Sequence, residues 1–257
     1  LQNTFVNGMS FKKNGDVIAA TEGGLYKIER GGQKWKFVGL IEYLLPTIAI
    51  DKNDHIYVSA WGSGIIRSID GGKEWEFLSK GGINSYTRHL SISPENVIYA
   101  ATEDGVFEFI PETKEWKQRG LTGVLLKNVT VTKDSGLWAG SYGRGLFLSR
   151  DNGTTWQKMN KGITNTQIKS IIIDTENTIL SGTSWGLFIK NIKEFEWKEI
   201  DIFSGKSVNA VVKDSNGNIY TGTTSGVFKY DAITKKWDRV KGDAAFLNIT
   251  TLTLDNA

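Results

Sequence analysis

The 257-residue chain contains no cysteine and only two histidines and three prolines. The absence of cysteine excludes disulfide bonds and cysteine-ligated metal sites. His55 and His89 are too few for a histidine-rich metal centre, so no metal is expected. The sequence also lacks an apolar run near the ~20 residues that a membrane-spanning helix needs, and no membrane span is predicted.

An excess of one charge is missing as well. The 31 basic and 28 acidic residues are interspersed and leave a formal net charge of +3. Proteins that bind nucleic acid usually cluster Lys and Arg on one face, so no nucleic-acid partner is expected. Neither a phosphate-binding glycine loop nor a nucleophile elbow occurs. No cofactor and no catalytic residues are therefore predicted.

Glycine and aromatic residues are abundant, with 29 Gly, 12 Phe, 9 Trp and 8 Tyr. Many aromatics with few prolines favour short strands joined by tight turns. The tryptophans recur every 40 or 41 residues, at Trp35, Trp75, Trp116, Trp156, Trp197 and Trp237. A glycine followed by two apolar residues keeps the same period from Gly24 to Gly226, and so do alternating segments such as "MSF" and "LTL". Three markers in phase indicate an internal repeat.

Each repeat reads as four strands separated by short turns. In the second repeat the strands are "TIAID", "HIYVSA", "IIRSI" and "WEFLS". Four antiparallel strands in about 40 residues, repeated along the chain, form the blade of a β-propeller. The predicted fold is an all-β propeller of four-stranded antiparallel blades, with six full repeats and the inner strand of a seventh.

Residues 1–257 are interpreted as a single propeller domain. Two arrangements remain open after the sixth repeat. The ring either closes as six blades with an additional strand, or it belongs to a longer parent chain that has seven or eight blades and further domains. We favour the second arrangement.

Two octapeptides, "SIDGGKEW" and "SRDNGTTW", fall in the turn between the third and fourth strands. In such a turn an aspartate can accept hydrogen bonds from backbone N–H groups, a glycine can adopt a positive φ, and the tryptophan can bury its ring between blades. These residues would repeat around the ring instead of converging on a pocket. We predict that they are structural fasteners: Ser68, Asp70, Gly72, Trp75, Ser149, Asp151, Gly153 and Trp156.

The octapeptides resemble the Asp-box, Ser-x-Asp-x-Gly-x-Thr-Trp, also called the BNR repeat. This repeat occurs in sialidases, sortilin-type receptors, xyloglucan hydrolases and photosystem-assembly propellers. Blades such as "NGNIYTGTTSGVFKYDAITKKW" are also similar to the propeller repeats of bacterial two-component sensor ectodomains. The resemblance implies an extracytoplasmic location, whether periplasmic, secreted or at the cell surface. A sialidase would also carry an Arg-Ile-Pro segment, which this chain lacks.

The turns between second and third strands should surround the mouth of the central channel, together with the connections between blades. Aromatic and arginine side chains at such a mouth suit stacking on sugars or anchoring a peptide. An alternative is that these rings only cover neighbouring blades. The predicted ligand-binding residues are Trp61, Tyr142, Arg144 and Trp185 in the turns, and Tyr43, Tyr86 and Arg88 in the connections.

The favoured function is a non-enzymatic module that binds a glycan or a protein or peptide ligand. One alternative is an Asp-box glycoside hydrolase or lyase that uses carboxylates at the mouth, among Glu22, Glu42, Glu103 and Asp104. Another is a structural scaffold within an assembly.

Overall fold

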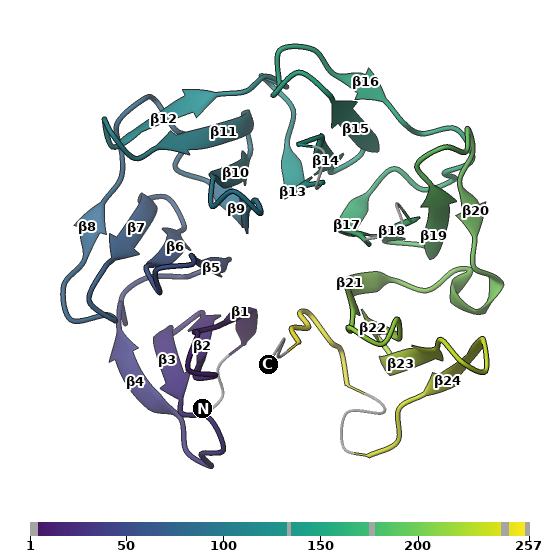
Figure 1. The fold of residues 1–257 in the computed structure, drawn as a ribbon, viewed down its shortest axis with the longest axis horizontal. Helices are drawn as coiled ribbons and strands as arrows, with labels where there is room; N and C mark the ends of the chain where they lie inside the picture. The colour runs from purple at the N-terminus through teal and green to yellow at the C-terminus, as the bar shows by residue number, and fades with distance from the viewer. Residues whose placement is uncertain (1–4, 133–134, 175–177, 243–246, 255–257) are drawn as a thin grey trace.

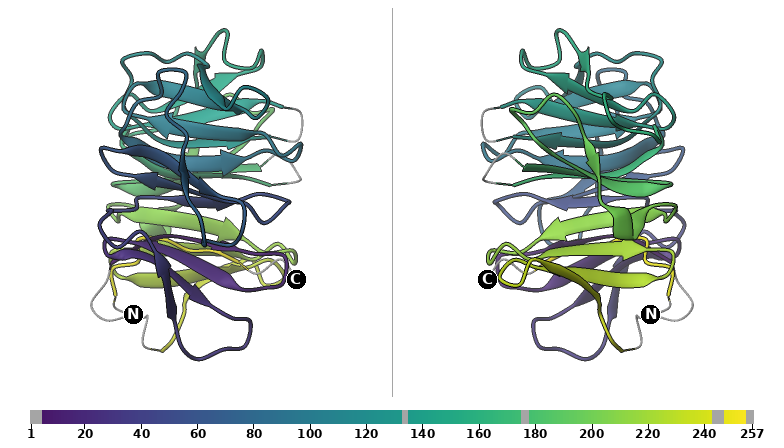
Figure 2. Two further views of the ribbon diagram at one scale, coloured as in Figure 1. Left: turned by 90° about the vertical axis from the view of Figure 1, so that its left-hand side faces the viewer. Right: turned by 90° about the vertical axis from the view of Figure 1, so that its right-hand side faces the viewer.

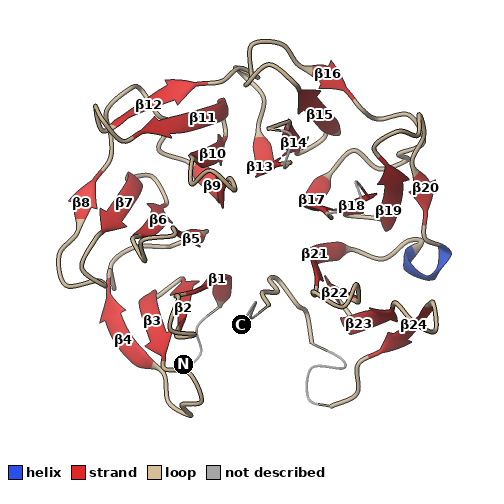
Figure 3. Ribbon diagram, viewed as in Figure 1, coloured by secondary structure: helices blue, strands red, loops and turns tan. Residues whose placement is uncertain are grey.

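The computed structural model describes residues 5–132, 135–174, 178–242 and 247–254. Six four-stranded antiparallel sheets surround a central axis (Figure 1). In each sheet the strands pair in chain order, from the axis to the perimeter (Figure 3). Seen from the side, the strands run through the thickness of the disc (Figure 2). The predicted all-β propeller with six blades is confirmed.

The blades follow the sequence repeat. Blade 1 contains β1 (Val6–Phe11), β2 (Val17–Thr21), β3 (Gly24–Ile28) and β4 (Lys36–Gly39), and blade 2 contains β5 (Ile48–Ile50), β6 (Ile56–Ala60), β7 (Gly64–Ser68) and β8 (Glu76–Phe77). Blade 3 contains β9 (Thr87–Ile92), β10 (Ile98–Thr102), β11 (Gly105–Ile110) and β12 (Glu115–Gln118), and blade 4 contains β13 (Leu126–Val131), β14 (Leu137–Ser141), β15 (Leu146–Ser149) and β16 (Gln157–Lys158). Blade 5 contains β17 (Ile168–Ile173), β18 (Thr178–Thr183), β19 (Gly186–Asn191) and β20 (Lys198–Glu199). After a short 3-10 helix, η1 (Asp201–Phe203), blade 6 contains β21 (Val208–Lys213), β22 (Ile219–Thr223), β23 (Gly226–Asp231) and β24 (Lys236–Arg239).

The hydrophobic core lies between blades. One cluster, for example, joins Tyr57 and Ile65 of blade 2 to Phe107, Phe109 and Trp116 of blade 3. Successive side chains of a strand point to opposite faces of its sheet. Because a blade lies on either side, the second strands β6 and β10 bury the side chains of both faces. The fold therefore gains stability at every blade-to-blade contact.

Three of the periodic tryptophans link their blade to the one before it. The indole Nε1 of Trp116 donates to the carbonyl oxygen of Leu78 at 3.1 Å, and that of Trp197 donates to Met159 at 2.6 Å. Trp156 donates in the same way to Arg119 at 2.8 Å. A buried indole N–H needs a hydrogen-bond partner, and here the partner lies three residues after the preceding repeat's tryptophan.

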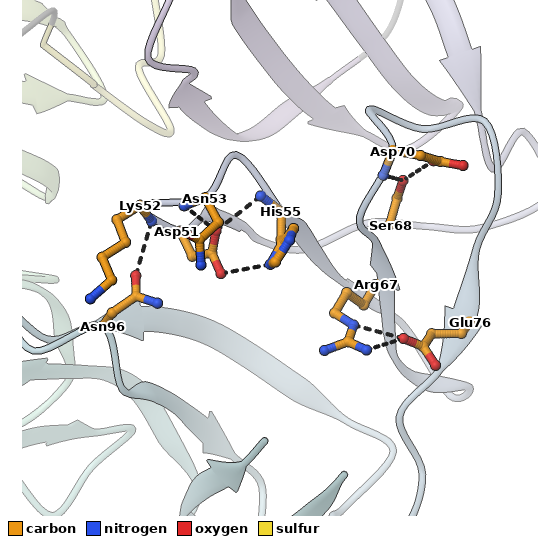
Figure 4. A network of polar contacts seen from close by, with 9 residues as sticks. All are labelled: Asp51, Lys52, Asn53, His55, Arg67, Ser68, Asp70, Glu76 and Asn96. Atoms are coloured by element: carbon orange, nitrogen blue, oxygen red, sulfur yellow. Dashed lines mark hydrogen bonds and ion pairs between the residues drawn. The ribbon is translucent and has the colours of Figure 1, made fainter. Parts of the chain in front are cut away.

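Hydrogen bonds also stabilise the turns between first and second strands. Asp51 accepts hydrogen bonds from the backbone N–H groups of Asn53 at 2.8 Å and His55 at 2.9 Å (Figure 4). The amide of Lys52 donates to the side chain of Asn96 in blade 3 at 2.9 Å. An acidic or amide side chain that accepts backbone N–H groups stabilises a tight turn. Here the turns also join neighbouring blades.

The C-terminal segment, residues 247–254, closes the wall of the central channel between β21 and β1 (Figure 1). The amide of Ile249 donates to Thr223 of blade 6 at 2.9 Å, and Thr250 Oγ1 donates to Val6 of blade 1 at 2.9 Å. The segment occupies the place predicted for a seventh inner strand. Within residues 247–254, however, the structure describes no strand, because these contacts do not extend into a ladder.

Candidate functional site

A cavity of about 620 Å³ lies on the axis of the propeller. Its wall includes residues from β1, β5, β9, β13, β17 and β21 and from the C-terminal segment. Glu22 and Trp61, which lie in turns between second and third strands, also line it. The mouth of the cavity is therefore on the face that carries these turns. Its volume is in the range of pockets that bind small ligands.

A β-bulge shapes the wall in five of the blades. The pairing of the first and second strands skips one residue near the start of the first strand. A bulge leaves one residue unpaired and changes the direction of its side chain. The skipped residues all line the cavity: Asn7, Arg88, Lys127, Lys169 and Asn209. In blade 2 the same repeat position is Pro46, which has no N–H to give to a ladder.

Three of the bulged residues are cations on consecutive blades. Arg88, Lys127 and Lys169 come from β9, β13 and β17, which are neighbours around the axis (Figure 1). Burial lowers the pKa of Lys127, and the charges of Arg88 and Lys169 lower it further. Burial also lowers the pKa of Lys169, whose Nζ donates to Asn209 Oδ1 at 2.9 Å. We call these three residues the cationic arc.

The residues next to the cationic arc contain polar atoms without partners. Eight buried side-chain nitrogen or oxygen atoms lack a hydrogen-bond partner among the described residues. Half of them belong to the cavity wall: Arg88 Nε, His89 Nδ1, Asn128 Oδ1 and Ser170 Oγ. Asn128 is only 9% exposed, and its amide nitrogen donates to the carbonyl of Lys169 at 2.9 Å. Burial lowers the pKa of His89 to about 4, so its imidazole is neutral at pH 7. Unpartnered groups are costly to bury, and such a concentration marks this wall as unusual.

Negative charge at the cavity is sparse. Among the described residues that line it, Glu22 is the one carboxylate. Glu103 lies nearby but forms an ion pair with Arg88. Glycoside hydrolysis by the usual mechanism needs two carboxylates on either side of the scissile bond. The described wall does not offer such a pair.

Two of the residues predicted for the ligand site line the cavity, and a third contacts one of them. Trp61 and Arg88 are in the wall, and the Tyr86 ring lies against the Trp61 ring with centroids 5.1 Å apart. The guanidinium carbon of Arg88 is 4.6 Å from the centre of the Trp61 ring. Blades 2 and 3 therefore bring Trp61, Tyr86 and Arg88 together at the rim.

The other predicted residues lie outside the cavity wall. Tyr142 and Trp185 are exposed by 55% and 62%, in turns of blades 4 and 5, and Arg144 is exposed beside Tyr142. Tyr43 is half-buried and packs against the apolar cluster between blades 1 and 2. Its ring also lies edge-on to the Phe77 ring, with the ring centroids 6.3 Å apart. The structure groups only part of the predicted set around the axis.

Both octapeptides form a network within their turns. Ser149 Oγ donates to Asp151 at 2.7 Å and accepts from the Gly153 N–H at 2.8 Å. Asp151 also accepts from the amide of Thr155 at 2.8 Å and its hydroxyl at 2.6 Å, and these bonds lower the Asp151 pKa to about 2. Gly153 has φ of +83°, and a Cβ there would collide with the carbonyl of Arg119. The bonds of Ser149 and Asp151 therefore hold the turn in its conformation.

The equivalent octapeptide of blade 2 repeats this arrangement. Ser68 Oγ donates to Asp70 at 2.8 Å (Figure 4). It also accepts from the Gly72 N–H at 2.8 Å, and Asp70 accepts from the amide of Lys73 at 3.0 Å. Gly72 has φ of +97°. The Trp75 ring packs against the cluster between blades 1 and 2. These turns lie at the end of the third strand, away from the cavity wall.

Sequence reasoning missed Lys127 and Lys169. Both occupy the same repeat position as Arg88, one residue after the first residue of the inner strand, in "LKNVTV", "IKSIII" and "TRHLSI". Aligning the repeats on polar positions, and not only on their apolar markers, would have placed the three cations on one level of the channel.

The described residues contain no helix long and apolar enough to cross a membrane. Nor do they contain a group of three or more His, Cys, Asp or Glu side chains arranged to hold a metal ion.

No protein-family model matches the chain, and no curated protein matches it. Among solved structures, it is similar to the extracellular domain of a putative one-component system from B. thetaiotaomicron, with a TM-score of 0.82 and 16% identity. That alignment covers 99% of this chain and 36% of the other, so the chain spans about a third of its relative's length. It is also similar to YCF48 bound to D1 peptide, with a TM-score of 0.68 and 19% identity over 86% of this chain and 76% of the other.

A third similar structure is a catalytically inactive virginiamycin B lyase from Staphylococcus aureus with quinupristin. Its TM-score is 0.77 at 10% identity, over 93% of this chain and 85% of the other. At these identities the similarities establish the fold, which extracellular domains, a peptide-binding protein and a lyase share.

Proposed function

We propose that this propeller is a non-enzymatic binding module, located outside the cytoplasm, whose glycan or peptide ligand enters the central channel. The observation that carries the proposal is the cavity of about 620 Å³ on the axis, open on the face of the Trp61 turn. Its wall combines apolar residues with amide, hydroxyl and charged groups, as ligand pockets do. Extracellular domains and a peptide complex among the similar structures support the location and the type of partner.

The described wall favours binding over glycoside hydrolysis. Glu22 is its one carboxylate, since Glu103 is paired with Arg88. Arg88, Lys127 and Lys169 outnumber it on the same wall. A glycosidase of the usual type would need a second acid across the cleft.

The test is a glycan array and a peptide display with the purified chain, repeated with a variant whose channel is filled. Ala210 lines the cavity, so Ala210→Phe should place a ring in it and abolish binding of the ligands that the wild type retains. Phe195→Ala is the matched control, because Phe195 is 86% exposed in a turn at the perimeter of blade 5. Retention of every ligand by a folded Ala210→Phe variant would place the binding site elsewhere.

A further inference from the structure

Positive charge gathers on one side of the cavity without an equal negative charge. Among the described residues, Glu103 pairs with Arg88, whereas Lys127 and Lys169 form no ion pair and Lys169 donates a hydrogen bond to the neutral amide of Asn209. Glu22 reaches the cavity from blade 1, on the other side of the ring from β13. Two ammonium groups therefore share a partly buried wall with no carboxylate paired to either.

Such an arrangement destabilises the protein when the cavity holds only water. Burial disfavours the charged form of a lysine, and like charges nearby add to the effect. Burial and like charge both lower the pKa of Lys127, and burial lowers that of Lys169. An anion in the cavity would offset these effects, because opposite charges a few ångströms apart attract more strongly in a partly desolvated site than in water.

The bulges indicate that these side chains are directed to the channel by the backbone. Each cation is the residue that the pairing skips, between Leu126 and Asn128 in blade 4 and between Ile168 and Ser170 in blade 5. Bulges are frequent beside functional sites, where they change the direction of a side chain. The three cations consequently occupy one level of the channel, one on each of three adjacent inner strands.

The remainder of the wall is suited to hydroxyl groups. Side chains of Asn7, Thr47, Asn209 and Thr251 line it with amides and hydroxyls, which can both donate and accept. The rim adds the rings of Trp61 and Tyr86. A sugar combines hydroxyl groups with apolar ring faces, whereas the cationic arc requires an acid group.

We propose that the cavity binds an acidic oligosaccharide, with the carboxylate or sulfate group of one sugar seated between Arg88, Lys127 and Lys169. The inference rests on the proposed function, since it names the ligand class of the same cavity. Sugars with a uronate group and sugars with a sulfate ester both fit this description, because each is an anion that carries several hydroxyl groups.

Isothermal titration of the purified chain with four probes tests the inference. The probes are a trigalacturonate, a sulfated galactotriose, neutral galactotriose and a triglutamate peptide. We expect one of the acidic trisaccharides to bind at least about tenfold more tightly than neutral galactotriose, as hydrogen bonds to charged groups commonly provide. The better of the two identifies the acid group, and its affinity should fall with rising salt.

Two variants connect this preference to the cationic arc. Lys127→Gln and Lys169→Gln should each weaken acidic trisaccharide binding by about tenfold or more and weaken galactotriose binding much less, because the neutral sugar has no acid group to lose a charged partner. Lys158→Gln is the matched control, because Lys158 is exposed on the outer strand β16 of blade 4. In the absence of ligand, Lys127→Gln should also raise the melting temperature, since it removes a buried charge that faces like charges.

The failures of the two proposals are distinguishable. Equal binding of acidic and neutral trisaccharides, insensitive to both lysine variants, would overturn the acidic-sugar inference and leave the channel as a ligand site. Tighter binding of triglutamate than of either acidic sugar would overturn the sugar class alone. Binding that survives in the Ala210→Phe variant would defeat the proposed function itself.

Discussion

The guanidinium carbon of Arg88 lies 4.6 Å from the centre of the Trp61 ring, although the two residues come from different blades. Tyr86 meets the same indole edge-on. A cation over an indole face contributes about 0.5–2 kcal/mol, and an aromatic pair adds a similar amount. The Trp61 ring thus fixes the position of a cation in the cavity wall and is itself held in place.

Trp61→Ala and Trp185→Ala should therefore differ in their effect on stability. We expect Trp61→Ala to lower the free energy of unfolding by about 1–2 kcal/mol, because it loses both ring contacts. Trp185 is 62% exposed, so Trp185→Ala should change it by less than about 0.5 kcal/mol. Urea denaturation measures both. A loss above about 2 kcal/mol for Trp185→Ala would mean that its ring is part of the core.

Ligand binding separates the same two variants. Trp61→Ala should weaken binding at the channel, because Trp61 lines the cavity and orients Arg88. If Trp185 also contacts the ligand, as predicted from its place on the mouth face, Trp185→Ala weakens binding with almost no change in stability. Unchanged affinity in the Trp185→Ala variant would restrict the site to the rim between blades 2 and 3.

The indole of Trp116 provides a test of the blade-to-blade fasteners. Trp116 is 2% exposed and donates to the carbonyl of Leu78. Trp116→Ala should lower the free energy of unfolding by about 3–5 kcal/mol. Trp116→Phe keeps most of the apolar ring but leaves the carbonyl without a donor, so its loss should be smaller, about 1–3 kcal/mol. Phe195→Ala serves as the control with an exposed ring, and equal losses for Phe195 and Trp116 would contradict the fastener role.

The lowered pKa of Asp151 predicts that the stability of the fold depends on pH in the acidic range. Hydrogen bonds from Thr155 and Ser149 hold its pKa at about 2 in the folded protein, below the value of ~3.9 for an unfolded chain. A lowered pKa means that the carboxylate stabilises the fold above the unfolded value and loses this effect as the pH falls through the folded value. Asp151→Asn should accordingly lower the melting temperature at pH 7.

The effect of Asp151→Asn should shrink as the pH falls from about 4 to about 2, where the wild-type carboxylate takes up a proton. Thermal unfolding of both proteins across this range provides the measurement. A difference that stays constant down to pH 2 would show that the carboxylate charge is not what holds the turn.

The repeat made most of the architecture predictable. Trp116, Trp156 and Trp197 recur in phase because each must reach the same carbonyl of the preceding blade, and a geometric requirement of this kind leaves a period in the sequence. Trp138, on the second strand of blade 4, is fully buried. Contacts that recur in every repeat can therefore be inferred from the periodicity of a single sequence.

The cavity wall was less predictable, because it depends on backbone irregularity. A bulge at Lys127 or Lys169 changes which side chains face the axis, and nothing in the local composition of "LKNVTV" signals it. Contacts between blades, such as that of Arg88 with Trp61, also depend on which loops become neighbours. Trp61 and Trp185 both lie in turns of the mouth face, yet their surroundings differ: Trp61 lines the cavity, whereas Trp185 is exposed outside it.

The lowered pKa of His89 predicts a second dependence of stability on pH, at less acidic values than that of Asp151. Its imidazole is buried in the channel wall, and burial lowers its pKa from 6.5 to about 4. Between these values the unfolded chain binds a proton that the folded protein does not, so the free energy of unfolding should decrease as the pH falls from 6.5 to 4 and level off below. His89→Gln should flatten this slope, whereas Asp151→Asn should leave it unchanged because Asp151 titrates at lower pH. Urea denaturation at half-unit pH steps would reveal the slope, and an identical slope in His89→Gln and wild type would assign it to another group.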